Sequence, residues 1–249
     1  MGSIDFSMDE KVAIVTGGSK GIGRAIAMAF AEHGAQVVLG ARYMEALKDA
    51  QQAIGATGRR VIAQPTDVAK SEDREALVQR AIDELGGVDV LVNDAALLTW
   101  GPMVNETRDR FLLAMETNVW AGLHLAQLCR ESMCSRGGGV VLYIASNQAL
   151  RPDFGIGTYA LTKAAIVNLT QLLAKEWARD GIRVNCLAPG LIRTDFAKDR
   201  VAEVEASGAP INPMMRVGDP TGLRAWRCFS RAQPGLSPLG LAMSSTAES

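Results

Sequence analysis

Short apolar, β-branched segments alternate with longer segments of helical periodicity, and this alternation constrains the fold more than any other feature. The predicted strands are residues 11–16, 36–40, 60–63, 88–92, 139–144 and 182–186. Predicted helices lie between them at residues 22–30, 72–85, 109–135 and 159–179. Apolar strands joined by helices are typical of a parallel sheet covered by helices on both faces. No linker interrupts the pattern before about residue 195, so we expect a single α/β domain over residues 1–220.

Composition excludes several classes of function. Lys and Arg number 26 and Asp and Glu 27, and this lack of basic excess argues against nucleic acid as a ligand. No apolar run reaches the roughly 18 residues that span a membrane, and the N-terminal residues lack the features of a signal peptide. Four cysteines without a C-x-x-C pair and only two histidines argue against a disulfide framework and a metal site. We therefore expect a cytoplasmic protein without a bound metal.

A glycine-rich turn joins the first predicted strand to the first predicted helix. It reads Thr16-Gly17-Gly18-Ser19-Lys20-Gly21-Ile22-Gly23. Glycines at such a turn allow the backbone to approach a pyrophosphate, and the helix N-terminus offers N–H groups and the positive end of its dipole. The spacing G-x-x-x-G-x-G differs from the commoner G-x-G-x-x-G, but its position between strand and helix predicts a dinucleotide site. The expected contacts are Gly17, Ser19, Lys20, Gly21, Ile22 and Gly23.

The second predicted strand ends in Gly40-Ala41-Arg42-Tyr43, without a carboxylate. NAD sites usually place Asp or Glu here for the ribose 2′-hydroxyl, whereas the 2′-phosphate of NADP needs a cation. Arg42 and Lys20 supply two cations, and a guanidinium fork matches phosphate geometry. We expect a preference for NADP(H), with NAD(H) possible. The alternative is that both side chains are ordinary solvated charges.

Tyr159 and Lys163 are four residues apart in a predicted helix and therefore share one face. A free tyrosine has a pKa near 10, and a neighbouring ammonium would lower this pKa toward neutrality. Tyr159 is therefore a candidate general acid and base. Ser146 follows the fifth predicted strand, at the carboxyl edge where doubly wound sheets bind ligands.

Taken together, these motifs resemble the short-chain dehydrogenase/reductase family over about residues 10–220. The resemblance also rests on Asp67-Val68, Asn93-Asp94-Ala95-Ala96, Asn118, Pro189-Gly190 and Thr194. It implies a Rossmann-like, doubly wound sheet of about seven parallel strands, usually in homo-dimers or homo-tetramers. It also implies hydride transfer between a nicotinamide cofactor and the carbonyl or alcohol carbon of a small molecule.

The resemblance implies a role for each matched residue. Ser146 would hydrogen-bond the substrate oxygen, and Tyr159 would exchange the proton. Lys163 would lower the pKa of Tyr159 and hold the nicotinamide ribose, and Asn118 would support a water that links Lys163 to solvent. The remaining implied cofactor contacts are Asp67 and Val68 at the adenine, Asn93 and Ala95 at the ribose, and Pro189, Gly190, Ile192 and Thr194 at the nicotinamide.

One motif departs mildly from the family pattern. The usual Asn-Asn-Ala-Gly is Asn93-Asp94-Ala95-Ala96 in this chain. Asp94 only accepts hydrogen bonds where an amide also donates, so we expect the loss of one hydrogen bond near the sheet edge. Ala96 in place of glycine is expected to tighten the backbone. We expect effects on stability or affinity but not a loss of function.

Residues 221–249 do not fit the family pattern. The family has an apolar helix and a last strand here, whereas residues 224–235 carry basic and proline residues that break an apolar helix face. Residues 223–241 can be translated back into the codons that could encode them, and these codons can be read in the frame that starts one base earlier. That frame permits the sequence Ala-Gly-Leu-Ala-Leu-Phe-Leu and, further on, Thr-Gly. Both resemble the apolar helix and the Thr-Gly of the family. We hypothesise a single-base frameshift near residues 220–222; the alternative is a divergent tail. We expect the last strand to be missing or altered, which would weaken the sheet edge and oligomer assembly.

Two other functions stay open at this point. One is reduction of a 3-oxoacyl thioester, although the charge balance predicts no basic face for an acidic carrier protein. The other is a non-catalytic nucleotide-binding protein with the same fold.

Residues 195–213 are predicted to form a mobile lid. Candidates for an apolar pocket wall are Leu97, Leu98, Trp100, Phe154 and Phe196.

Overall fold

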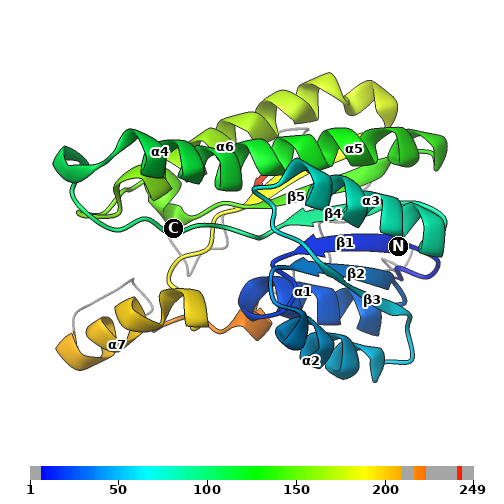
Figure 1. Ribbon diagram of the computed structural model, residues 1–249, viewed down its shortest axis with the longest axis horizontal. Coiled ribbons are helices and arrows are strands. Elements are labelled where there is room, and N and C mark those ends of the chain that lie inside the picture. The colour runs from blue at the N-terminus through cyan, green and yellow to red at the C-terminus, as the bar shows by residue number, and fades with distance from the viewer. Residues whose placement is uncertain (1–6, 209–215, 223–239, 243–249) are drawn as a thin grey trace, which may run out of the picture.

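The computed structural model describes residues 7–208, 216–222 and 240–242, and its centre is a parallel β-sheet with helices on both faces (Figure 1). The strands are β1 Val12–Thr16, β2 Gln36–Ala41, β3 Val61–Pro65, β4 Val90–Asn93, β5 Gly139–Ile144, β6 Ile182–Leu187 and β7 Gly240–Ala242. Their order across the sheet is β3-β2-β1-β4-β5-β6-β7, and each neighbouring pair is parallel. The predicted doubly wound α/β fold is confirmed.

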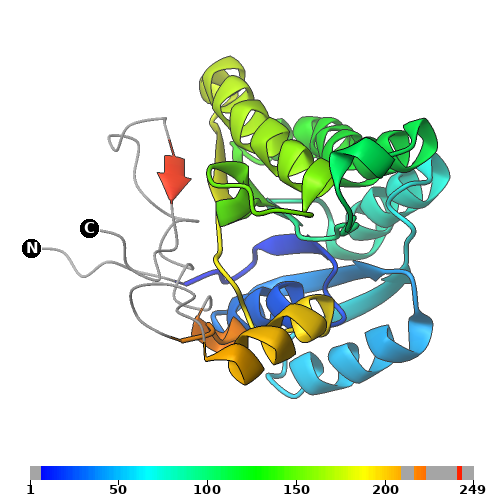
Figure 2. The same cartoon turned by 90° about the vertical axis from the view of Figure 1, so that its left-hand side faces the viewer.

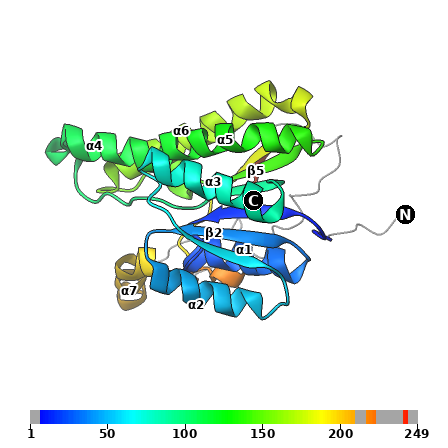
Figure 3. The ribbon, with the colours of Figure 1, turned by 45° about the vertical axis from the view of Figure 1, so that its right-hand side comes forward.

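Helices divide between the two faces of the sheet. They are α1 Gly21–Glu32, α2 Met44–Gly55, α3 Ser71–Leu85, α4 Arg108–Met115, α5 Ala121–Ser135, α6 Gly157–Glu176 and α7 Lys198–Ser207. Short 3-10 helices cover Met103–Asn105, Asn147–Ala149, Ala178–Asp180 and Asp195–Ala197. Figures 2 and 3 show α1 and α2 on one face and α3, α5 and α6 on the other, with α7 on the side of α1 and α2.

The alternation of side chains along β1 explains why both faces are covered. Val12 and Ile14 belong to one apolar core, and Ala13 and Val15 belong to a second core on the opposite face. All four side chains are fully buried. Burial of a valine or isoleucine favours folding by about 1.5–3 kcal/mol, so each face needs its own helices.

Two local features differ from the sequence-based prediction. The helix predicted over residues 109–135 is interrupted by a π-helical turn, Glu116–Trp120, between α4 and α5. Such turns insert an extra residue into a helix and are frequent at functional sites. The prediction also did not name α2, although Leu47, Ala50 and Ile54 are buried at helical spacing in it.

A last strand is present at the edge of the sheet. β7 has three residues and pairs with the second half of β6, Asn185 with Gly240 and Leu187 with Ala242. The expectation of a missing strand is therefore wrong, and the expectation that the strand is altered stays a prediction. The rest of the unusual tail, residues 223–239 and 243–249, lies outside the described residues. In the predicted lid, residues 198–207 form α7, and residues 209–215 also lie outside the described part.

Candidate active site

The predicted site residues gather at the carboxyl edge of the sheet. Because the strands are parallel, their carboxyl ends meet there: Thr16 pairs with Asn93, and Ile144 with Leu187. The segments that follow these ends carry the glycine turn after β1, Arg42 after β2, Asp67 and Val68 after β3, Ala95 after β4, Ser146 after β5, and Pro189, Gly190, Ile192 and Thr194 after β6. Doubly wound sheets bind ligands at this edge.

The glycine turn leaves space that side chains would fill. Gly17 and Gly21 have φ of 68° and 56°, in the left-handed region that favours glycine. A Cβ on Gly23 would lie 2.6 Å from the carbonyl oxygen of Gly17, so a side chain is excluded there. The N-cap residue of α1, Lys20, makes no side-chain capping hydrogen bond, and the Asp94 carboxylate accepts from the N–H of Gly23. The turn therefore fits a pyrophosphate, which would meet backbone N–H groups at this helix end.

The two cations predicted to recognise a 2′-phosphate have different surroundings. Arg42 is exposed directly after β2, with its Cζ atom 5.5 Å from the centre of the Tyr43 ring. Lys20 Nζ donates to Asp195 Oδ2 at 2.9 Å, and both side chains are exposed. This hydrogen bond raises the pKa of Lys20 and lowers that of Asp195. Arg42 is therefore the better-placed cation, because Lys20 already has a carboxylate partner.

The segment after β3 is fixed by a residue that the sequence analysis did not single out. The buried guanidinium of Arg74 donates to Val68 O at 2.6 Å, Glu116 Oε1 at 2.9 Å and His124 Nδ1 at 3.0 Å. Arg74 thus joins the predicted adenine contacts to the π-helical turn. A signal was present, because Arg74 lies on the same helical face as the buried Leu77, three residues later.

Ser146, Tyr159 and Lys163 lie together beside the end of β5. The Ser146 hydroxyl accepts from Gln148 N at 3.2 Å and donates to Asn147 Oδ1 at 3.3 Å, and it acts on the Tyr159 phenol to lower its pKa. Lys163 Nζ donates to Ile144 O at 2.6 Å and lies 5.4 Å from the centre of the Tyr159 ring. All three side chains are buried. The structure therefore brings the Ser146 hydroxyl, from the segment after β5, to the phenol and ammonium groups that α6 carries.

The pKa of Tyr159 corrects one expectation. This pKa is raised to about 12, chiefly by burial of the phenol; hydrogen bonding to Ser146 acts to lower it and the Asp94 carboxylate to raise it. The expected lowering of the Tyr159 pKa toward neutrality by Lys163 is therefore wrong for this structure. Lys163 donates to a backbone carbonyl, and burial lowers its own pKa.

Asn118 holds the loop after β4 against α6. Its Oδ1 accepts from Leu97 N at 2.7 Å, and its Nδ2 donates to Leu97 O and Thr162 Oγ1, each at 2.9 Å. Thr162 Oγ1 donates in turn to Tyr159 O at 2.7 Å. The amide group of Asn118 therefore connects this loop to the helix that carries Tyr159 and Lys163.

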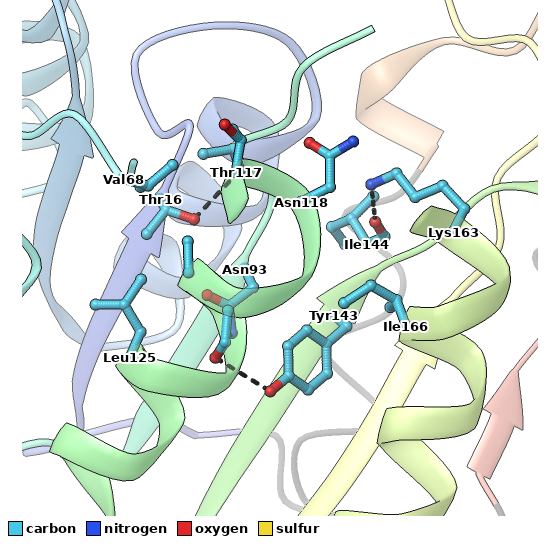
Figure 4. A pocket seen from close by; sticks show the side chains of 13 residues that line it. Thr16, Val68, Asn93, Thr117, Asn118, Leu125, Tyr143, Ile144, Lys163 and Ile166 are labelled. Carbon is cyan, nitrogen blue, oxygen red and sulfur yellow. Dashed lines mark hydrogen bonds between the residues drawn. The ribbon is translucent and has the colours of Figure 1, made fainter. Parts of the chain in front are cut away.

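A cavity extends from these residues between β4, β5, the π-helical turn and α6. Figure 4 shows Lys163 bonded to Ile144 at one wall, beside Asn118. At another wall, Tyr143 Oη donates to Gly122 O at 3.2 Å (Figure 4). Asn93 and Ala95 also line this cavity, so the predicted ribose contacts and the predicted catalytic lysine face one space.

Asp94 makes a hydrogen bond through an oxygen that asparagine would share, and the expected loss of a donated hydrogen bond stays a prediction. Its Oδ2 accepts from Gly23 N at 2.9 Å, and its backbone N–H donates to Thr16 Oγ1 at 3.1 Å. The interaction needs only an acceptor, which a carboxylate supplies. Ala96 does not have a positive φ, so its methyl group causes no backbone strain of that kind.

The segment after β6 lies against the glycine turn. A Cβ on Gly21 would lie 3.1 Å from Thr194 Cγ2. Ile192 forms an isolated parallel bridge with Gly218, which ties this segment to residues 216–222. The Phe196 ring centre lies 6.1 Å from that of Tyr159, and the Phe154 side chain is 93% exposed. Of the five predicted pocket residues, Phe196 thus lies next to Tyr159. Leu98 packs against the small apolar cluster that contains Tyr159.

The described residues contain no group of three or more His, Cys, Asp and Glu side chains that could hold a metal ion. Within the same part of the chain, no helix combines the length and apolar character needed to cross a membrane.

Comparison with known proteins gives consistent matches. The sequence model of the family described as short chain dehydrogenase matches residues 11–205. Dehydrogenase/reductase SDR family member 4 of Oryctolagus cuniculus is 42% identical over 189 residues, which are 76% of this chain and 73% of that protein. The structure of L-sorbose reductase from Gluconobacter frateurii with NADPH and L-sorbose has a TM-score of 0.86 and 33% identity, covering 91% of each chain. A 7α-hydroxysteroid dehydrogenase with NADH and 7-oxo glycochenodeoxycholic acid also has a TM-score of 0.86, with 35% identity over 92% of this chain and 90% of that one.

Proposed function

Because the chain belongs to the short-chain dehydrogenase/reductase family and is an NAD(P)-dependent oxidoreductase, we propose that it reduces a small-molecule carbonyl with NADPH, or oxidises the corresponding secondary alcohol with NADP⁺. The observation that carries the proposal is the cluster of Ser146, Tyr159 and Lys163 beside the glycine turn. The cofactor supplies the hydride, and these side chains orient the substrate and manage the proton.

Tyr159 acts as the general acid of the reduction. Its raised pKa keeps the phenol protonated at neutral pH, which is the form that can give a proton to a carbonyl oxygen. The Ser146 hydroxyl, buried beside this phenol, holds the same substrate oxygen. Lys163, whose Nζ lies 5.4 Å from the Tyr159 ring centre, would hold the nicotinamide ribose, as the family resemblance implies. Asn118 keeps the loop after β4 in place against α6.

The preference for NADP(H) rests on Arg42. It is exposed at the end of β2, where an NAD site would usually place a carboxylate. The glycine turn, Asp67, Val68, Asn93, Ala95 and the segment from Pro189 to Thr194 form the rest of the proposed cofactor site. Lys20 can contribute a second cation once it exchanges Asp195 for a phosphate. A homo-dimer or homo-tetramer and a cytoplasmic location, both expected from the sequence, complete the proposal.

A substrate panel tests the proposed function. NADPH oxidation is followed with aliphatic and aromatic ketones, aldehydes and a 3-oxoacyl thioester, and the panel is repeated with NADH. We expect turnover of ketones or aldehydes, with a higher kcat/KM for NADPH than for NADH. Turnover restricted to the thioester would replace the proposed substrate class, and a higher kcat/KM for NADH would refute the cofactor preference.

A further inference from the structure

A buried arginine, Arg74, lies in the first turn of α3, next to the segment that follows β3. It is 2% exposed. Its Nε atom donates to His124 Nδ1 at 3.0 Å. Its Nη1 atom donates to Val68 O at 2.6 Å and to Glu116 Oε1 at 2.9 Å. One guanidinium therefore bonds acceptors in the segment after β3, in the π-helical turn and in α5.

The acceptors suit a guanidinium that is removed from water. Burial of a charged group costs free energy unless the charge is paired and the donors are satisfied. Glu116 supplies the opposite charge. Because a guanidinium can only donate, His124 Nδ1 accepts and carries no proton. The His124 ring also stacks on Trp120, with ring centres 5.8 Å apart and planes 9° apart, so this acceptor is itself held in place.

Val68 is the residue that Arg74 holds on the cofactor side. The preceding residue, Asp67, has a support of its own, because its N–H donates to Asp73 Oδ2 at 2.7 Å. The carbonyl of Val68 accepts from Arg74 instead. The Val68 side chain is buried and lines the same cavity as Asn118 (Figure 4). Arg74 therefore joins the wall that carries Val68 to the π-helical turn that carries Asn118.

Resting on the proposed function, we propose that Arg74 is a positioning residue of the cofactor site, which holds Val68 where the adenine of the cofactor binds. The two donating nitrogens fix the Val68 carbonyl relative to the π-helical turn and to α5. Adenine is common to NADPH and NADH, so Arg74 serves both cofactors equally. It differs in this from Arg42, whose proposed partner is the 2′-phosphate.

Arg74→Lys tests this role. The variant keeps a positive charge for Glu116, but a single ammonium nitrogen cannot take the places of both Nε and Nη1. We expect the KM for NADPH and the KM for NADH to rise by the same factor, about tenfold, with kcat changed by less than about threefold. Steady-state kinetics with a ketone that the substrate panel identifies measure both constants. Unchanged KM values, or a fall in kcat at unchanged KM, would overturn the proposal.

Arg136 provides a matched control beside the start of β4, at the opposite edge of the sheet. It also bonds one carboxylate, that of Asp89 at 2.8 Å, and two backbone carbonyls, those of Gly86 and Glu10. Arg136→Lys should lower the melting temperature and leave both KM values unchanged. An equal rise of KM in Arg136→Lys and Arg74→Lys would mean that KM responds to lost stability, and Arg74 would have no specific role.

His124→Phe removes one acceptor of Arg74 with little change in shape. A phenyl ring can still stack on Trp120, but it cannot accept from Arg74 Nε, so the guanidinium loses its bond to α5. We expect both KM values to rise together by about threefold or more, because a buried donor is left without its partner. Unchanged KM values in a His124→Phe protein with normal circular dichroism would contradict the proposal.

Direct binding separates this proposal from the proposed function. Isothermal titration calorimetry with NADP⁺, and with ADP-ribose, which carries the adenine without the nicotinamide, needs no turnover. Arg74→Lys should weaken the binding of both by about tenfold. If the unmodified protein binds them but reduces no carbonyl of the panel, the proposed function fails and these binding data alone support the role of Arg74. If the unmodified protein reduces ketones and Arg74→Lys binds both nucleotides equally tightly, only the role of Arg74 fails.

Discussion

Tyr159 holds its proton at neutral pH because its phenol is buried, and this suits reduction better than oxidation. The spacing of Tyr159 and Lys163 correctly placed both side chains on one helical face, but it suggested the opposite pKa shift. Spacing on a helix determines a shared face, not which acceptor a long side chain reaches. In the structure, Lys163 Nζ reaches the carbonyl oxygen of Ile144.

A substitution of Arg42 tests the proposed preference for NADPH over NADH. Arg42→Ala removes the exposed guanidinium at the end of β2. A charge-assisted hydrogen bond contributes about 1.5–3 kcal/mol, so the KM for NADPH should rise by roughly tenfold or more, with little change in the KM for NADH. Steady-state kinetics with both cofactors measure this.

Arg59→Ala is the control for the loss of an exposed arginine, because Arg59 pairs with Asp9 away from the carboxyl edge. It should leave both KM values unchanged. An equal loss of affinity for NADH and NADPH in Arg42→Ala would contradict recognition of the 2′-phosphate by this residue.

Among the structural elements, the loop between β4 and α4 determines where α6 begins. Thr99 Oγ1 accepts from Tyr159 N at 3.1 Å, and Glu106 Oε2 accepts from the fully buried Thr158 hydroxyl at 2.5 Å. The hydrogen bond from Thr158 lowers the pKa of Glu106, which keeps this carboxylate ionised as an acceptor. The loop thus holds the first turn of α6, where Tyr159 lies.

Removal of this anchor should affect the chemical step more than cofactor binding. Glu106→Ala leaves the Thr158 hydroxyl without its acceptor next to Tyr159, and we expect kcat to fall by about tenfold through misplacement of the phenol. The KM for NADPH should change little, because the glycine turn is not involved. A raised KM for NADPH with an unchanged kcat would show that the loop positions the cofactor instead. Glu84→Ala on α3 is a suitable control for the loss of a glutamate away from this loop.

How far the sequence reveals each element depends on the kind of interaction that forms it. The buried strands and the long helices were predictable because apolar periodicity follows directly from burial on a sheet face. The π-helical turn at Asn118 was not, because it depends on where α4 and α5 pack, and residues 109–135 read as one helix. Thr99 and Glu106 were also missed, because their partners on α6 are distant in the sequence and a polar side chain in a loop has no periodic signature.

Over the whole molecule, all residues of the proposed site lie within the first 194 residues. The family model matches residues 11–205, so residues 221–249 lie outside both the site and the match. The tail contributes β7 to the sheet edge as a strand of three residues. We retain the proposal that residues 221–249 follow a single-base frameshift. The coding DNA tests it: codons for residues 223–241 should permit the family's apolar helix and Thr-Gly one base earlier, and codons that do not would refute the frameshift.

The central claim is that this chain transfers a hydride to a carbonyl carbon while Tyr159 supplies the proton. The most direct measurement uses NADPH deuterated on one face of C4, with a ketone that the panel identifies, and mass spectrometry of the alcohol product. With one of the two deuterated faces, we predict one deuterium on the carbinol carbon, and Tyr159→Phe should form this product at least about a hundredfold more slowly. A product without deuterium from either face, or an unchanged rate in Tyr159→Phe, would contradict the account.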